Sequence, residues 1–158
     1  MLERMRGASL IRAMLFAALL ATILETQASE GCAPDQAKQI QIGGQTFVVE
    51  VAASPSERER GLSGRALLKP GTGLWFVFPE PDKYGFWMRD MRFPIDLIWV
   101  SPELKIAGAV TLQPCVNKNC SIHYAPRRVA YVLEVNAGEF AGKQGDPVAW
   151  RCLGESLN

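Results

Sequence analysis

Short hydrophobic runs separated by turn residues cover most of the chain after residue 37. Polar and apolar residues alternate over 38–42, Gly43-Gly44 suits a two-residue hairpin turn, and 46–52 is rich in β-branched residues, so we predict a β-hairpin. Later apolar runs of strand length predict strands at 74–78, 85–88, 95–100, 104–112, 129–135 and 147–152. About seven or eight short strands with one or two short helices indicate an all-β single domain, either a sandwich or a jelly-roll-like barrel.

One short helix is predicted after the hairpin. Ser54 is suited to cap it, Pro55 to occupy its first position, and Glu57 to complete a capping box. Residues 30–38 are polar and aperiodic and predict an extended arm, whereas 136–143 permits a single helical turn.

Two residues are expected to interrupt strands. Pro79 should end the strand at 74–78, and Gly108 should mark a bulge within 104–112. The segment 114–126 has no hydrophobic periodicity and is predicted to be a loop.

The N-terminal part has the features of a secretory signal peptide. Arg4, Arg6 and Arg12 accompany an apolar run over 13–24 that is shorter than the roughly 20 residues of a membrane-spanning helix. We therefore expect a signal peptide at 1–28, cleaved after Ala28, in preference to an uncleaved membrane anchor or a lipoprotein.

The remaining chain is expected to comprise an arm with the first strand (29–45), a β domain (46–152) and a C-terminal tail (153–158). The leader holds three of the 17 basic and two of the 16 acidic residues, so the rest carries no net charge. This balance gives no basis for binding nucleic acid or an anionic membrane surface. We expect a monomer without a cofactor, whose partner is a small polar ligand or an envelope protein.

Four cysteines follow the leader, and an even number in an exported chain favours disulfides. Three pairings are possible, and we favour Cys115–Cys120 as a loop staple and Cys32–Cys152 as a clasp between the ends. With His123, the first pair also forms C-x4-C-x2-H, but zinc is disfavoured because the chain has no second histidine. The expected location is periplasmic or extracellular.

Two carboxylates interrupt apolar strands and are the main candidates for chemistry. Asp96 lies in 95–100 and Glu134 in 129–135, and an unpaired buried charge would be costly. We expect an arginine to pair with Asp96, either as a purely structural pair or as part of a cleft. The proposed ligand-binding residues are Arg58, Arg60, Trp87, Arg89, Asp90, Asp96 and Glu134.

Three functions remain open. The first is binding of a polar ligand or an envelope partner in a groove around Trp87–Asp96 and Arg58/Arg60, with one or two exposed aromatic rings. The second is a hydrolase in which Asp96 and Glu134, or His123, act as acid and base. The third is a structural accessory protein without a pocket.

Four ordered blocks resemble a known family: 57–65, 73–78, 86–96 and 131–146. Together they are similar to the bacterial and archaeal domain of unknown function 192, over about 47–148. The resemblance implies a compact, jelly-roll-like β domain that is often exported, and it implies no activity. The chain departs from the family pattern at Ser63, usually Met, at Asp90-Met91, usually Asn-Thr, and at Ile95, usually Leu. The Asp90-Met91 departure makes a ligand role at Asp90 less transferable.

Overall fold

The computed structural model describes residues 32–115 and 120–152, which form a β domain. This confirms the all-β class, and the expected leader and tail lie outside the described residues. The elements are η1 (Pro34–Gln36), β1 (Gln39–Ile42), β2 (Gln45–Ala52), α1 (Pro55–Arg60), β3 (Thr72–Asp82), β4 (Gly85–Phe86), β5 (Ile95–Val100), β6 (Ile106–Leu112), β7 (His123–Tyr124), β8 (Val129–Asn136) and β9 (Val148–Arg151). Within the described residues, no helix is both long and apolar enough to cross a membrane.

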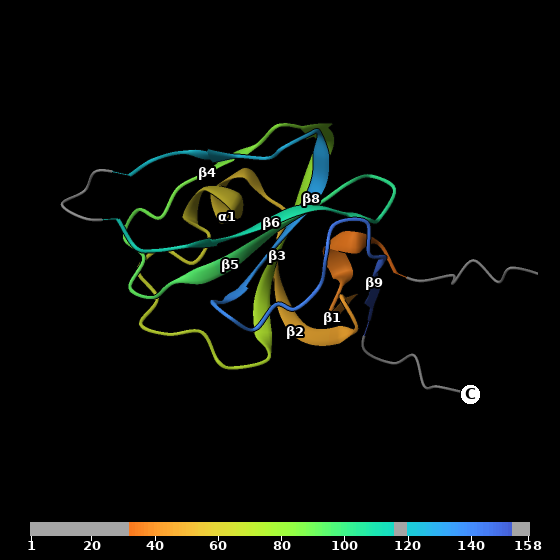
Figure 1. Ribbon diagram of the computed structural model, residues 1–158, viewed down its shortest axis with the longest axis horizontal. Helices are drawn as coiled ribbons and strands as arrows, with labels where there is room; N and C mark the ends of the chain where they lie inside the picture. Colours follow the sequence, from red (N-terminus) through yellow and green to blue (C-terminus); the bar gives the residue numbers. More distant parts are fainter. Residues whose placement is uncertain (1–31, 116–119, 153–158) are drawn as a thin grey trace, which may run out of the picture. The chain divides into compact units, whose positions relative to one another are not determined.

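Seven strands form one sheet in the order β6-β5-β8-β3-β2-β1-β9, and β4 pairs with β7 in a separate ribbon. Every strand pair is antiparallel except β2 and β3, whose connection contains α1. The sheet curls until its two edges meet (Figure 1). There, Ile106 N donates to Asp146 O at 3.0 Å and Val148 N to Leu104 O at 2.9 Å. The curled sheet therefore corresponds to the barrel alternative.

Period-two alternation gives the sheet two hydrophobic clusters, one on each face. The inner cluster contains residues from all seven strands and so fills the curl. Its largest members include Trp75, Ile98 and Leu133. The outer cluster includes Phe76, Leu97 and Val132, together with residues that follow α1 and β4. Both faces of β5 and β8 are consequently buried.

The local signals of the hairpin and the helix are present in the structure. Ile42 pairs with Gln45 across two glycines that both have positive φ, as a tight hairpin turn requires. The Ser54 side chain accepts from Glu57 N, and the Glu57 carboxylate accepts from Ser54 N at 2.8 Å, which completes the capping box.

Three expectations for the segments between the main strands are corrected. The arm is not fully extended, because Pro34–Gln36 form a 3-10 turn. In the segment 136–143, Asn136 ends β8 and a single hydrogen-bonded turn follows, in which Glu139 N donates to Asn136 O, so no helix forms. A further strand, β7, lies inside the segment that was expected to be a loop.

Two details of the strands also differ from expectation. β3 continues through Pro79 to Asp82, because the regular pairing with β8 ends at Val77 and no ladder hydrogen bond is required of the proline. A bulge occurs in β6, but its extra residue is Ala107, since Trp99 pairs with Gly108 and Val100 with Ile106.

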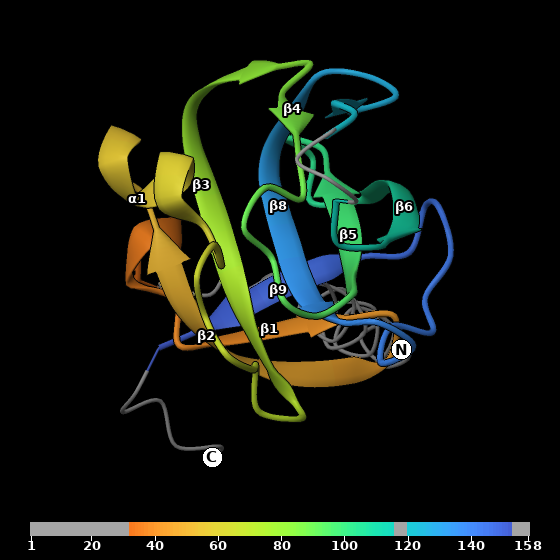
Figure 2. The ribbon, with the colours of Figure 1, turned by 90° about the vertical axis from the view of Figure 1, so that its left-hand side faces the viewer.

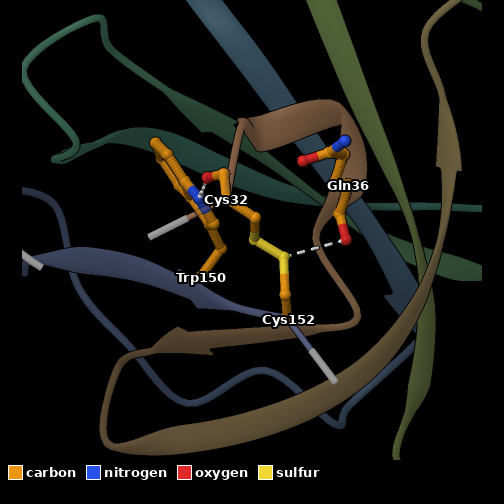
Figure 3. Close-up of a disulfide and its surroundings, with 4 residues drawn as sticks. All are labelled: Cys32, Gln36, Trp150 and Cys152. Atoms are coloured by element: carbon orange, nitrogen blue, oxygen red, sulfur yellow. Dashed lines mark hydrogen bonds between the residues drawn. A yellow bond between two sulfur atoms is a disulfide. The ribbon is translucent and has the colours of Figure 1, made fainter. Parts of the chain in front are cut away.

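The cysteines pair as favoured from the sequence. Cys115 is joined to Cys120, with Cα atoms 5.2 Å apart, and Cys32 to Cys152, with Cα atoms 6.2 Å apart. Figure 3 shows the second bond between η1 and the end of β9, where Trp150 Nε1 also donates to Cys32 O at 2.9 Å. Cys152 Sγ lies 3.1 Å from Gln36 O, but an oxidised sulfur has no proton to donate. The disulfide thus fastens the beginning of the domain to its last strand.

Candidate functional site

A hollow of about 300 Å³ lies between α1, β3 and β4, on the outer face of the sheet. In Figure 2, β3 and β8 run side by side and α1 lies beside β3. The hollow is lined by Arg58, Glu59, Arg60, Gly61, Leu62, Ser63, Phe76, Phe78, Tyr84, Gly85, Phe86, Trp87, Met91 and Glu134. Four of the seven proposed ligand-binding residues are therefore brought together: Arg58, Arg60, Trp87 and Glu134.

The capped helix α1 supplies the charged rim of the hollow. Arg58 donates through Nη1 to the carbonyl oxygens of Ala53 and of Val77, the latter at 3.1 Å. Its guanidinium carbon also lies 5.4 Å from the centre of the Phe78 ring. Glu59 and Arg60 are exposed. Arg58 is thus fixed by the protein itself, whereas the charges of Glu59 and Arg60 lie in solvent.

Aromatic rings form the walls of the hollow. The Phe86 ring is nearly perpendicular to those of Phe76 and Phe78, with centroids 5.3 and 6.3 Å away. Tyr84 stacks on Phe78 at 3.6 Å, and its hydroxyl donates to Glu80 O. Trp87 also lines the hollow and is 40% exposed. These mutual contacts hold the rings in place without a ligand.

Glu134 is the most buried charged side chain in the lining, with 7% of its surface exposed. Its neighbours across the sheet are Leu74 on β3 and Leu97 on β5. Among the described residues, no hydrogen bond or ion pair reaches its carboxylate. Its polar group is therefore surrounded by apolar side chains and faces the hollow.

Burial raises the pKa of Glu134 to about 8, and the positive charge of Arg65 offsets part of this increase. Arg65 is itself engaged by Glu50, through two hydrogen bonds of 2.6 and 2.9 Å. The hydrogen bond from Arg65 lowers the pKa of Glu50. Glu134 consequently carries a proton in most molecules at neutral pH and can either donate or accept a hydrogen bond.

Asp96 is buried on the other face of the sheet and is fully engaged there. Its Oδ1 accepts from Thr111 Oγ1 at 2.6 Å, and its Oδ2 accepts from Gly138 N at 2.8 Å and Phe140 N at 3.2 Å. The prediction that an arginine pairs with Asp96 is therefore wrong, because a hydroxyl group and two backbone amides satisfy the carboxylate instead.

The proposed acid/base pair of Asp96 and Glu134 is also corrected. Asp96 pairs with Val135, whereas Leu97 pairs with Glu134, so the two carboxylates point to opposite faces of the sheet. They therefore cannot act on the same bond of one substrate.

The other predicted residues lie outside the lining. Arg89 is exposed with its guanidinium carbon 5.0 Å from the Trp87 ring centre, so it supports that wall from outside. Asp90 has a φ of 57°, and its carbonyl accepts from Gly64 N at 3.0 Å. Asp and Asn tolerate this left-handed conformation, which gives Asp90 a role in the turn. His123 pairs with Phe86 on the ribbon and does not line the hollow.

Sequence reasoning missed three of the ring walls, Phe76, Phe78 and Tyr84. Phe76 and Phe78 could have been found, because they alternate along one strand with Leu74 and therefore share its face. Tyr84 precedes the ribbon in a loop, where no periodicity marks its direction.

The profile of DUF192, described as "Uncharacterized ACR", matches residues 38–150. The chain belongs to the DUF192 family. The matched segment runs from the start of β1 into β9 and contains every residue that lines the hollow. No curated protein matches the chain.

Two solved structures resemble this DUF192 protein. A protein of unknown function from Novosphingobium aromaticivorans has a TM-score of 0.64 and 28% identity, covering 71% of this chain and 84% of its own. A candidate transcription regulator from Sinorhizobium meliloti has a TM-score of 0.64 and 27% identity, covering 76% of this chain and 98% of its own. These proteins share the curled β fold.

Proposed function

We propose that this DUF192 protein binds a small ligand, with an apolar body and a polar group, in the hollow between α1, β3 and β4. The observation that carries the proposal is Glu134, a buried carboxyl group that faces the hollow without a partner among the described residues. A ligand that forms a hydrogen bond with Glu134 gains a net interaction of roughly 0.5–1.5 kcal/mol, or roughly 1.5–3 kcal/mol if one partner is charged. The ring walls bury its apolar part.

The two alternatives fit less well. The predicted hydrolase would use Asp96 with Glu134, or His123, but Asp96 lies on the opposite face of the sheet and His123 does not line the hollow. A structural partner without a pocket does not match a chain that has this hollow. The description of the Sinorhizobium protein suggests a role in transcription. The net charge of +1 of the present chain gives no support for DNA binding.

We also infer that the protein works outside the reducing cytoplasm. Two disulfides within one domain support export, because cytosolic thiols are normally kept reduced. Recovery of the protein from a periplasmic or culture fraction, with residues 1–28 removed, would test this.

A thermal-shift screen of small amines, alcohols, sugars and carboxylates on the wild type and Glu134→Gln tests ligand binding. We expect a compound that raises the melting temperature of the wild type by several degrees and shifts Glu134→Gln much less. Asp96→Asn is the matched control, because it alters a buried carboxylate on the other face and should keep the ligand-induced shift. Equal shifts in the wild type and Glu134→Gln for every compound that binds, or no shift by any compound, would contradict the proposal.

A further inference from the structure

We propose that the ligand of the hollow carries a positively charged ammonium group, which binds beside the Glu134 carboxylate and against the surrounding aromatic rings. This inference rests on the proposed function and specifies its ligand class. It is carried by the pairing of one unpartnered buried acid with several ring faces in the same hollow.

The rings at this site already bind cations of the protein. Arg58 lies 5.4 Å from the centre of the Phe78 ring, and Arg89 lies 5.0 Å from that of Trp87. Such contacts are attractive because the face of an aromatic ring is electron-rich, and they strengthen when water is excluded. Because Arg58 and Tyr84 already cover the Phe78 ring, an ammonium group that enters the hollow would contact the remaining rings of the lining, Phe76, Phe86 and Trp87.

Glu134 gives an ammonium ligand an advantage over a neutral one. Its flanking residues Leu74 and Leu97 bring no charge to it. A hydroxyl group of a ligand would gain one hydrogen bond there, whereas an ammonium group would gain a hydrogen bond and an ion pair in surroundings of low polarity.

The arginines do not turn the hollow into an anion site. Arg58 Nη1 is directed at two backbone carbonyls and not at Glu134, and Arg60 is exposed at the rim next to the opposite charge of Glu59. An anionic ligand would have to lie near Glu134, whose own ionisation it would oppose. A cationic ligand, in contrast, would favour the ionised form of Glu134 and pair with it.

Binding of an ammonium group should be coupled to loss of the Glu134 proton. The charged groups near Glu134 are Arg65, which is itself paired with Glu50 of β2, and Arg58, Glu59 and Arg60 of α1. Tyr84 stays neutral, since burial raises its pKa. Only ionised Glu134 forms the ion pair, so affinity for an ammonium ligand should rise about tenfold from pH 6 to 7 and about fivefold from pH 7 to 8.

Isothermal titration of the full chain with three compounds of similar shape tests the ligand class: 2-phenylethylamine, 2-phenylethanol and 3-phenylpropionate. We expect the amine to bind about tenfold or more tightly than the alcohol, and the acid most weakly. In two buffers of different ionisation enthalpy, amine binding at pH 7 should release close to one proton. Glu134→Gln should abolish this release and lower amine affinity about tenfold, while leaving that of the alcohol unchanged.

A second variant tests the proposal if Glu134→Gln does not fold. Trp87 is exposed, so Trp87→Ala should fold, and it should weaken the amine more than the alcohol. Equal or tighter binding of the alcohol or the acid would refute the ammonium class. The proposed function would still stand if a neutral compound bound in a Glu134-dependent manner, and both proposals would fail if no compound bound at all.

Discussion

Glu134 and Asp96 lie on adjacent strands and differ in how their burial is compensated. Asp96 accepts three hydrogen bonds, two of them from backbone amides of the turn that follows β8. Glu134 accepts none from the described residues and borders a hollow. Asp96 therefore stabilises the fold, whereas Glu134 remains available for a ligand.

Both carboxylates were recognisable in the sequence, because each interrupts an apolar strand. Their separation was not, because it depends on the register that pairs Leu97 with Glu134, and a shift of one residue would have placed both on one face. The partners of Asp96 were equally hidden: two of them are backbone amides, which have no signature in a sequence.

Glu134 should make the stability of the protein depend on pH. Its pKa is about 8 when folded, against 4.5 as the ordinary value. The folded state thus binds an extra proton between these values, and the free energy of unfolding should fall as pH rises from 4.5 to 8. The loss is at most roughly 5 kcal/mol, at about 1.36 kcal/mol per pKa unit.

Urea unfolding at pH 5, 6, 7 and 8 would measure this dependence. The unfolding free energy of Glu134→Gln should not fall with pH in this way, so the difference in unfolding free energy between the two proteins should change steadily with pH. Glu59→Gln, at the exposed rim, should follow the wild type. Parallel curves for the wild type and Glu134→Gln would show that Glu134 titrates normally.

At the scale of the element, α1 is predicted by its local sequence and also supplies residues that line the hollow. Its start could be predicted in full, since the capping box needs only residues within one turn of each other. The course of β3 could not, because Pro79 ends a strand only where its neighbour requires a hydrogen bond, and that depends on where β8 stops pairing.

Removal of the helix cap should destabilise the domain. Ser54→Ala loses the side-chain acceptor for Glu57 N and should lower the free energy of unfolding by about 1 kcal/mol. Ser54→Thr keeps a hydroxyl acceptor at this position and should retain most of the stability that the cap contributes. Ser56→Ala is the control, because this exposed serine lies on the same helix and its hydroxyl contacts only that of Ser54 among the described residues. Equal losses for Ser54→Ala and Ser56→Ala, in chemical denaturation, would argue against the cap.

At the scale of the whole domain, strand positions followed from periodicity, but their order did not. The parallel pairing of β2 with β3 and the placement of β8 between β3 and β5 join segments far apart in sequence. Both arrangements are needed for the site, since they bring Glu134 of β8, Phe76 of β3 and residues of α1 into the lining of one hollow. Local sequence patterns predict the individual strands and the helix, whereas the site depends on pairing between strands that are far apart in the sequence.

The two disulfides should contribute unequally to the stability of the domain. Cys32 and Cys152 are 120 residues apart, and Cys115 and Cys120 are 5 apart. The entropy lost by the unfolded chain on closing these loops corresponds to about 5 and about 2 kcal/mol, respectively. We expect the double variant Cys32→Ser/Cys152→Ser to unfold at much lower urea concentration than Cys115→Ser/Cys120→Ser. Replacing both members of a pair leaves no free thiol to rearrange, so each variant controls for the other. A larger loss from opening the short loop would mean that native contacts around Cys115, and not chain entropy, set the contribution of these bonds.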